Sequence, residues 1–229
     1  EAMIDDLKTT ALCIYPTKAL TQDQLRGLGR FQVPAQGVEF LAGTYDGDTP
    51  GNLRRKLRDG GNVVLTNPDM LHTGILPNHA RWNRFFTHLK YIVVDEVHAY
   101  RGVFGSHLAN VMRRLRRICA HYGSKPQFIC CSATIANPAE HAERIAGGPM
   151  ELVTGDGSPK GPKQFVLWNP PPLDTAAMGQ QDQWRTGGDR RSPLWEAVHL
   201  MSSLVREGVQ TIAFVRTRLA SELVFRNTR

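Results

Sequence analysis

Two carboxylates and a histidine follow a short apolar run in the middle of the chain. Residues 91–94 read YIVV, and Asp95, Glu96 and His98 come after them. An apolar run without polar alternation is typical of a strand that is buried on both faces of a parallel sheet. In an open α/β sheet, ligands bind outside the carboxyl ends of the strands. The sequence therefore predicts a reaction site at these three side chains.

The residue types suit a magnesium nucleotide. Mg²⁺ keeps several of its waters and is commonly held by one or two carboxylates together with substrate phosphates. Asp95 could anchor the ion through water, and Glu96 could orient or deprotonate the water that attacks a phosphoryl group. The letters D-E-x-H alone are weak support, because a solvated strand end with a capping aspartate has the same sequence. The interpretation depends on the ends of the other strands.

Hydroxyl side chains stand at the ends of two other predicted strands. The strand pattern of residues 10–15 stops shortly before Thr17 and Lys18, and residues 63–65 stop at Thr66. A threonine and a lysine at a strand-to-helix turn can offer a hydroxyl, backbone N–H groups and a charge to a phosphate. An ordinary helix cap followed by a solvated lysine has the same sequence, so both interpretations stay open.

A third strand pattern, residues 128–131, ends at Ser132 and Thr134. Their hydroxyls could hydrogen-bond the carboxylate and the imidazole of the central strand end, provided that the two strands are neighbours. The helix predicted before this strand carries four arginines on its polar side. These arginines could follow a nucleic-acid backbone, or they could form the solvated face that a helix packed on a sheet requires.

The order of these patterns predicts the fold class. Strand and helix patterns alternate over residues 10–148, which is typical of an α/β fold with a parallel sheet and helices on both faces. Residues 154–162, TGDGSPKGP, lack apolar periodicity and indicate a linker. Strand patterns at 165–168 and 211–215, with a helical pattern at 194–205, predict the beginning of a second unit. We expect a first domain over 1–150, a linker over 151–163, and the N-terminal part of a second domain over 164–229.

Composition and charge favour a globular protein with a polyanionic partner. The chain has 229 residues, of which 41% are hydrophobic, and a formal net charge of +7. The charge is uneven, because residues 98–139 contain no acidic side chain. An uneven positive charge supports a polyanionic partner more strongly than the net value alone.

The cysteines and histidines do not indicate a metal centre, because neither shows a ligand spacing. Without C-x-x-C spacing, we expect the four cysteines to be buried and reduced. No apolar run approaches the roughly 20 residues of a membrane span, and the N-terminus lacks the layout of a signal peptide. We expect a cytoplasmic protein with no membrane partner. The cysteines are Cys13, Cys119, Cys130 and Cys131.

Taken in order, these segments resemble the motifs of superfamily 2 DExH-box helicases. The matching segments are YPTKAL with Thr17-Lys18, TNPDML from Thr66, DEVH from Asp95, SAT from Ser132 and TIAFVRTR from Thr211. The phrases YDGDTP, YRGVFGSHLANVMRRLRRICAHYGSKPQF and WNPPP are similar to the branch of the mitomycin-repair-factor helicases and their RecQ-like fungal relatives. The likeness spans nearly the whole chain.

The resemblance implies a pair of RecA-like domains that hydrolyse ATP between them and move along single-stranded DNA. In this branch the movement is 3′ to 5′, and the function is DNA repair. By this resemblance Asp95 holds Mg²⁺ through water and Glu96 activates the hydrolytic water. His98, together with Ser132 and Thr134, links the nucleotide state to nucleic-acid binding.

The resemblance also implies nucleic-acid contacts in both domains. Thr17, Lys18 and Thr66 contact the backbone from the first domain, and Arg216 or Thr217 from the second.

A further pair, Tyr100 and Phe104, is similar in position to the aromatic loop by which RecQ-type helicases couple DNA contact to hydrolysis. An aromatic ring stacked on a base contributes about 1–3 kcal/mol to binding. Packing of both rings against the sheet is the alternative.

The sequence also departs from the family pattern. No G-x-x-x-x-G-K-[ST] phosphate loop occurs in it. The chain opens where the family has already passed that loop and ends before the arginines that contribute about 10³ to 10⁵ in rate to related enzymes. We therefore expect an internal fragment that does not hydrolyse ATP alone. A catalytically silent nucleic-acid-binding module and an RNA-directed DExH helicase are the alternatives.

Overall fold

The computed structural model describes residues 6–31, 40–133, 135–155, 157–159, 161–170 and 190–228. The chain divides into two compact units, residues 1–156 and 157–229. Their boundary falls inside the predicted linker, and the described residues from 147 to 170 form no helix or strand. Each unit is described by itself below.

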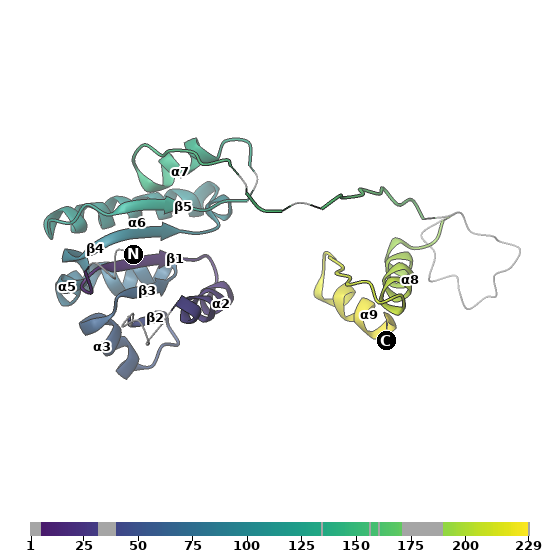
Figure 1. The fold of residues 1–229 in the computed structure, drawn as a ribbon, viewed down its shortest axis with the longest axis horizontal. Helices are drawn as coiled ribbons and strands as arrows, with labels where there is room; N and C mark the ends of the chain where they lie inside the picture. The colour runs from purple at the N-terminus through teal and green to yellow at the C-terminus, as the bar shows by residue number, and fades with distance from the viewer. Residues whose placement is uncertain are drawn as a thin grey trace, which may run out of the picture. The chain divides into compact units, whose positions relative to one another are not determined.

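The first unit is built on a five-stranded parallel sheet with the order β2-β3-β1-β4-β5 (Figure 1). Because every strand runs in the same direction, the carboxyl ends of all five meet at one edge of the sheet. This confirms the predicted α/β class. The strands are β1 (Thr10–Ile14), β2 (Ala42–Thr44), β3 (Val63–Thr66), β4 (Leu89–Val94) and β5 (Gln127–Cys130).

The helices of the first unit begin where the sequence supplies caps. The side chain of Thr17 accepts a hydrogen bond from the backbone N–H of Leu20, and that of Asn67 accepts one from Met70. Such caps satisfy backbone donors that a helix end leaves unpaired. The helical segments are α2 (Lys18–Leu28), η1 (Gly29–Phe31), α3 (Gly51–Gly60), α4 (Pro68–Met70), η3 (Leu71–Ile75), η4 (Leu76–Trp82), α5 (Asn83–Thr87), η5 (Val97–Ala99), α6 (Gly102–His121) and α7 (Pro138–Ala146).

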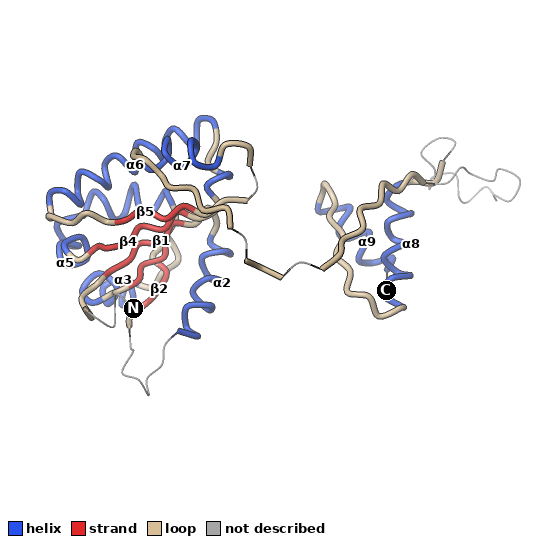
Figure 2. The backbone as a smooth tube through the Cα atoms, turned by 45° about the horizontal axis from the view of Figure 1, so that its top comes forward, coloured by secondary structure: helices blue, strands red, loops and turns tan. Residues whose placement is uncertain are grey.

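Helices cover the two faces of the sheet unequally. On one face, Leu12 and Ile92 pack in a large core with side chains from α3, α5, α6 and the η3–η4 segment. On the other face, α2 packs over the strands β2 and β3 (Figure 2). Tyr91 and Val93 point to this second face and are only partly buried. Each fully buried large apolar side chain stabilises the fold by about 1.5–3 kcal/mol, so the first face contributes most of the core.

Two expectations for the end of the sheet were wrong. The sequence predicted that β4 and β5 are buried on both faces, but Tyr91 and Val93 are half-buried and Ile129 is 40% exposed. The physical reason is that β5 is an edge strand of this sheet and no described helix covers the second face of β4 and β5. Cys131 is likewise exposed, whereas Cys13 and Cys119 are buried as predicted.

The second unit contains two described helices that pack together, α8 (Pro193–Arg206) and α9 (Arg218–Thr228). Residues 165–168 and 211–215 do not form the strands that the sequence predicted. Phe165 and Phe214 are 91% and 88% exposed. A β-prone run becomes a strand only when a neighbouring backbone pairs with it, and these runs have no such neighbour within the described part. No described helix of either unit is long and apolar enough to cross a membrane.

Candidate active site at the strand ends

The end of β4 carries the two carboxylates in a strained turn. The backbone N–H of Asp95 donates to the carbonyl of Ile14 on β1 (3.0 Å), and the N–H of Glu96 donates to Asp95 Oδ1 (2.9 Å). Glu96 has φ 53° and ψ 42°, and it is the one non-glycine residue with positive φ in the described parts of the chain. A left-handed conformation is unfavourable by roughly 1–2 kcal/mol for such a residue. Strain of this kind gathers at functional sites.

His98 connects the ends of β4 and β5. The backbone N–H of Ala133 donates to His98 Nδ1 (3.1 Å), and His98 Nε2 lies 3.0 Å from Glu96 Oε2. Because Nδ1 accepts a hydrogen bond, the ring proton of a neutral His98 is on Nε2, which donates it to the Glu96 carboxylate. The side chains of His98 and Glu96 are 28% and 41% exposed. Both therefore reach solvent at the sheet edge rather than a packed interior.

The two strand ends are adjacent, as the site required. Cys131 N donates to Val94 O (3.0 Å), and Val97 N donates to Cys131 O (2.9 Å). The observed connection to His98 differs from the predicted hydrogen bond from a hydroxyl group. Ser132 Oγ donates to the carbonyl of Ala133 (2.9 Å), so His98 is held by a backbone N–H and not by the Ser132 hydroxyl. Thr134 lies outside the described residues.

One residue that the sequence interpretation missed supports this arrangement from α7. His141 Nε2 lies 2.9 Å from the carbonyl oxygen of Val97 in η5. A carbonyl can only accept, so His141 Nε2 donates this hydrogen bond. Neither this contact nor the Ala133 N–H has a sequence signal, because both depend on the backbone geometry of a segment far away in the chain.

The two aromatic residues after the site behave differently from each other. The Tyr100 ring is fully buried, and its hydroxyl has no hydrogen-bond partner among the described residues. Burial raises the pKa of Tyr100, and the nearby charges of Asp95 and Glu96 raise it further. Phe104 is 43% exposed on the first turn of α6, which begins at Gly102. The ring centroids of Tyr100 and Phe104 are 5.5 Å apart.

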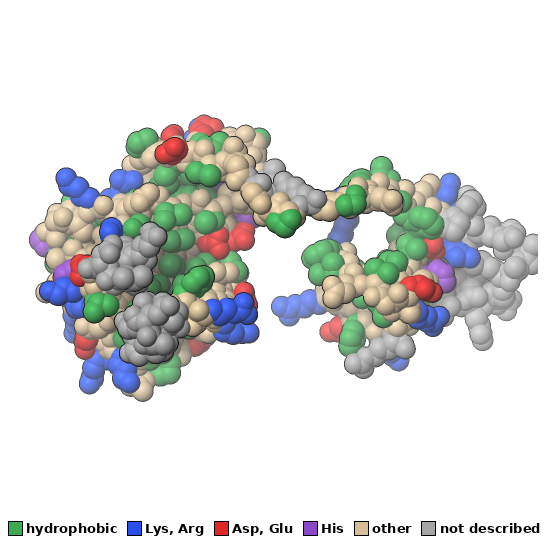
Figure 3. Space-filling model, in the orientation of Figure 1, with side chains coloured by type: hydrophobic (Ala, Val, Ile, Leu, Met, Phe, Trp, Pro, Cys, Tyr) green, Lys and Arg blue, Asp and Glu red, His purple; other side chains and the backbone are tan. Residues whose placement is uncertain are grey.

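The donor set suits Mg²⁺ held jointly with phosphates. Asp95 and Glu96 are oxygen donors that reach solvent, and no cluster of three or more potential metal ligands occurs among the described residues. Mg²⁺ is usually bound in this way, with one or two carboxylates and substrate phosphates in place of an all-protein cage. Asp95 is the better placed ligand, since Glu96 is engaged by His98. Figure 3 shows acidic side chains at this edge of the first unit with basic ones beside them.

The predicted nucleic-acid residues of the first unit are all engaged within the fold. Thr17 caps α2, and Lys18 forms an exposed ion pair with Asp48. Thr66 is 1% exposed, and its hydroxyl donates to the carbonyl of Tyr45 (2.7 Å). The Thr66 hydroxyl is therefore already used in a hydrogen bond within the fold. Lys18 would need to release only one exposed partner, Asp48, to contact a phosphate. Their contacts with nucleic acid stay predictions.

In the second unit, Thr217 occupies the position that Thr17 has in the first. Thr217 Oγ1 accepts a hydrogen bond from the N–H of Ala220 (3.1 Å) at the start of α9, and Arg216 is exposed beside it. Both threonines therefore cap a helix that follows an apolar run. The roles of Arg216 and Thr217 in binding nucleic acid also stay predictions.

Comparison with known proteins identifies the family. The sequence model of the DEAD/DEAH box helicases matches residues 2–142. The chain belongs to the DEAD/DEAH box helicase family. Among relatives of this helicase chain, the uncharacterized ATP-dependent helicase YprA of Bacillus subtilis is 47% identical over 98% of the chain. The ATP-dependent helicase HRQ1 of Saccharomyces cerevisiae is 42% identical over all of it.

Solved structures agree with this assignment. The DUF1998 helicase MrfA bound to DNA and AMPPNP is 46% identical over 99% of the chain, with a TM-score of 0.89. These matches confirm the predicted branch of superfamily 2 and its RecA-like fold. The chain spans only 28% of YprA, 21% of HRQ1 and 30% of the MrfA chain.

Proposed function

We propose that this chain is the part of an ATP-dependent DNA helicase that carries the water-activating carboxylate and its coupling histidine. The observation that carries the proposal is the hydrogen-bonded series from Glu96 through His98 to the backbone of Ala133. It joins the ends of two adjacent strands at the edge where a parallel sheet binds its ligand. A coupling device needs such a connection between two segments that can move separately.

Each residue of the series has one chemical role. Glu96 takes the proton of the water that attacks the terminal phosphorus of ATP, while the bond from that phosphorus to the departing ADP breaks. His98 donates to the other side of the carboxylate and fixes its orientation. Asp95 would hold Mg²⁺, and the ion would stabilise the charge that develops on the phosphates.

We further propose that a longer protein supplies the phosphate-binding loop. The open second face of β4 and β5 is the surface that such a segment would cover, because it presents half-buried Tyr91 and Val93 beside exposed Ile129 and Cys131. The outer edge of β5 pairs with no strand among the described residues, and one more strand of that segment would pair there. The 229-residue chain alone should then hydrolyse no ATP, and DNA-stimulated phosphate release from it would contradict this part of the proposal.

DNA is the proposed substrate of the motor. The net charge of +7 and the absence of acidic residues from 98 to 139 favour a polyanion, and the similar protein MrfA has been crystallised with DNA. Unwinding in the 3′ to 5′ direction and a role in DNA repair are the finer parts of the proposal, and they rest on the family resemblance.

The test is Glu96→Gln in a longer protein that contains the phosphate loop. The amide cannot accept the proton, so we expect the steady-state ATPase rate to fall by about 10² to 10⁴ with little change in single-stranded DNA affinity. Glu151→Gln, an equal change at an exposed position outside the site, is the matched control. Retained turnover would remove Glu96 from its role, and unwinding of RNA but not DNA would favour an RNA-directed enzyme.

A further inference from the structure

A groove lined by arginines lies between the helices α6 and α7 of the first unit. It has a volume of about 960 Å³ and is bounded by the N-terminal half of α6, residues 135–137 and one side of α7. Small residues of α6, such as Gly102 and Ala109, line it and leave the space open. Lys18 and the other residues predicted to contact a nucleic-acid backbone do not line it.

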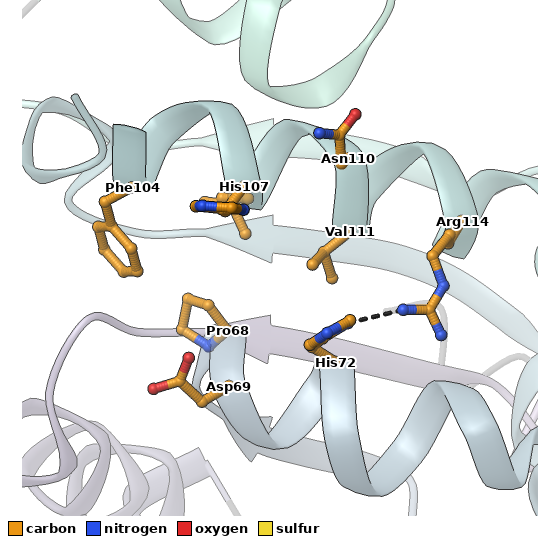
Figure 4. Close-up of a pocket in the computed structure, with 9 residues that line it drawn as sticks. Pro68, Asp69, His72, Phe104, His107, Asn110, Val111 and Arg114 are labelled. Atoms are coloured by element: carbon orange, nitrogen blue, oxygen red, sulfur yellow. Dashed lines mark hydrogen bonds between the residues drawn. The ribbon is translucent and has the colours of Figure 1, made fainter. Parts of the chain in front are cut away.

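Two neighbouring arginines of α6 have different partners. Arg114 Nη1 donates a hydrogen bond of 2.6 Å to His72 Nδ1 (Figure 4). Arg113 Nη1 donates to the neutral amide oxygen of Asn110 (3.0 Å). Figure 4 shows that Asn110 points away from His72, and both Asn110 and Arg113 line the groove. Within the described residues, the guanidinium group of Arg113 therefore has no carboxylate partner.

Arg101 and Arg144 line the same groove. Arg101 is exposed, and its side chain forms no hydrogen bond or ion pair in the described part of the chain. Arg144 pairs with Glu140 one turn earlier on α7, and this pair is exposed, so that water and salt screen it. Among the described residues that line the groove, none carries a carboxylate. Guanidinium groups that share a groove without a carboxylate attract an anion.

The groove also receives the N-terminal ends of two helices. Arg101 is the N-cap residue of α6 and Asn137 that of α7, and neither side chain accepts a hydrogen bond from its helix. The Asn137 amide donates instead to Glu140 Oε2 (2.9 Å). The first backbone N–H groups of both helices therefore lack a side-chain cap, and they add partial positive charge to that of the arginines.

We infer that this groove binds phosphate groups of a single-stranded DNA backbone. Proteins contact phosphate oxygens with arginine and asparagine side chains, backbone N–H groups and helix N-termini. The groove offers each of these groups, with Asn110 as an uncharged donor. Arg101 and Arg113 are separated by about 18 Å along the axis of α6, so that more than one phosphate can bind at once.

The lining distinguishes a nucleic-acid backbone from an acidic protein segment. Protein interfaces place large apolar and aromatic anchors at their centre. Of the large apolar side chains that line the groove, Tyr100 and Ile145 are buried in the core and Ile135 is half-buried. An apolar anchor of a protein segment would therefore find little surface to cover. The inference rests on the proposed function, because it takes DNA to be the substrate, and it adds a backbone site between α6 and α7.

A salt series with single-stranded DNA tests the inference. Each lost phosphate contact reduces the magnitude of the slope of log affinity against log salt by about 0.7. From roughly 50 to 200 mM salt, the loss of affinity should therefore be about 2.6-fold smaller for Arg113→Ala than for the unchanged chain. Arg101→Ala should behave in the same way, whereas Arg113→Lys keeps the charge and should keep the slope. Fluorescence anisotropy measures the affinities for two unrelated sequences, because a backbone contact does not depend on the bases.

Charge-matched variants control for a general effect of charge. Arg117→Ala removes the same charge from an exposed position of α6 that does not line the groove, and it should keep the slope. Ser106→Glu places a carboxylate in the groove and should weaken binding. Ala120→Glu adds the same charge at an exposed position of α6 outside the groove and should weaken binding less. Circular dichroism shows whether each variant keeps its helices.

The outcomes separate this inference from the proposed function. If Arg101→Ala and Arg113→Ala bind DNA with the slope of the unchanged chain, the groove is not a backbone site and the helicase proposal stands. The inference is also overturned if a polyglutamate peptide loses affinity for Arg113→Ala while the DNA slope of that variant does not change. If the chain binds no single-stranded DNA, the proposal of DNA as the substrate fails together with the groove.

Discussion

Glu96 combines a catalytic assignment with an unfavourable backbone conformation. Its left-handed φ and ψ turn the chain sharply out of β4, so that a side chain two positions later, His98, can reach back to the carboxylate. The left-handed turn at Glu96 is therefore part of the geometry that brings Glu96 and His98 into contact.

Substitution by glycine and by alanine should reveal this strain. Glycine adopts positive φ at little cost, whereas alanine does not. We expect Glu96→Gly to have a free energy of unfolding about 1 kcal/mol higher than that of Glu96→Ala. The measurement is equilibrium denaturation of both variants.

Glu143 provides a control position, at which the glycine variant should have a lower free energy of unfolding than the alanine variant. It is exposed in the right-handed helix α7, where glycine is less favourable than alanine by about 0.8–1.0 kcal/mol. If glycine were the less stable substitution at both positions, the left-handed conformation of Glu96 would be refuted.

At the scale of elements, β5 and its continuation differ from the other strands in how much they are covered. Cys131 is exposed just past β5, while Cys13 in β1 and Cys119 in α6 are buried. Burial raises the pKa of Cys13 to about 12 and that of Cys119 to about 11. These buried thiols are therefore almost entirely protonated at neutral pH, and the thiolate is the reactive form.

Thiol labelling should report this difference. In the 229-residue chain, we expect Cys131 to react first with a maleimide-type reagent, and Cys13 and Cys119 to react only on unfolding. Labelling should accelerate as pH rises, because deprotonation increases toward each raised pKa. Mass spectrometry of the digested protein identifies the order.

The same labelling experiment tests whether an upstream segment covers the open face of β4 and β5. In a longer protein with the upstream segment present, Cys131 should be protected while Cys13 stays unreactive. Equal labelling of Cys131 in both proteins would show that nothing covers the open face of β4 and β5.

The elements also show what the sequence could predict. Local signals were sufficient for the helix cap at Thr17 and for the parallel sheet, because a cap and the alternation of strands and helices are encoded by nearby residues. The prediction that β5 is buried on both faces was wrong, because the burial of a strand depends on which neighbouring elements cover it. The hydrogen bond from Ala133 to His98 could not be predicted, since any residue type other than proline supplies the same N–H.

At the scale of the whole molecule, charge should dominate encounter with DNA. The formal net charge is +7, and Lys18 and Arg216 lie exposed in separate units. Each phosphate neutralised on a single strand lowers the slope of log affinity against log salt by about 0.7. A few contacts should therefore make binding weaken about tenfold between roughly 50 and 200 mM salt.

The expected result is a salt slope that Lys18→Ala and Arg216→Ala each reduce by about 0.7. Arg58→Ala is the matched control, because it removes one positive charge from α3, where no nucleic-acid contact is predicted. Fluorescence anisotropy over a salt series measures all three variants. An unchanged slope in both test variants would contradict their assignment as phosphate contacts.

The backbone N–H of Ala133 affects which substitutions at this position can become fixed during evolution. A main-chain N–H persists whichever ordinary side chain position 133 bears, and Ala133 is exposed. Sequence drift at this site should therefore leave the connection to His98 untouched. Proline alone lacks the N–H, so the substitution Ala133→Pro would remove the hydrogen bond to His98 that every other substitution preserves.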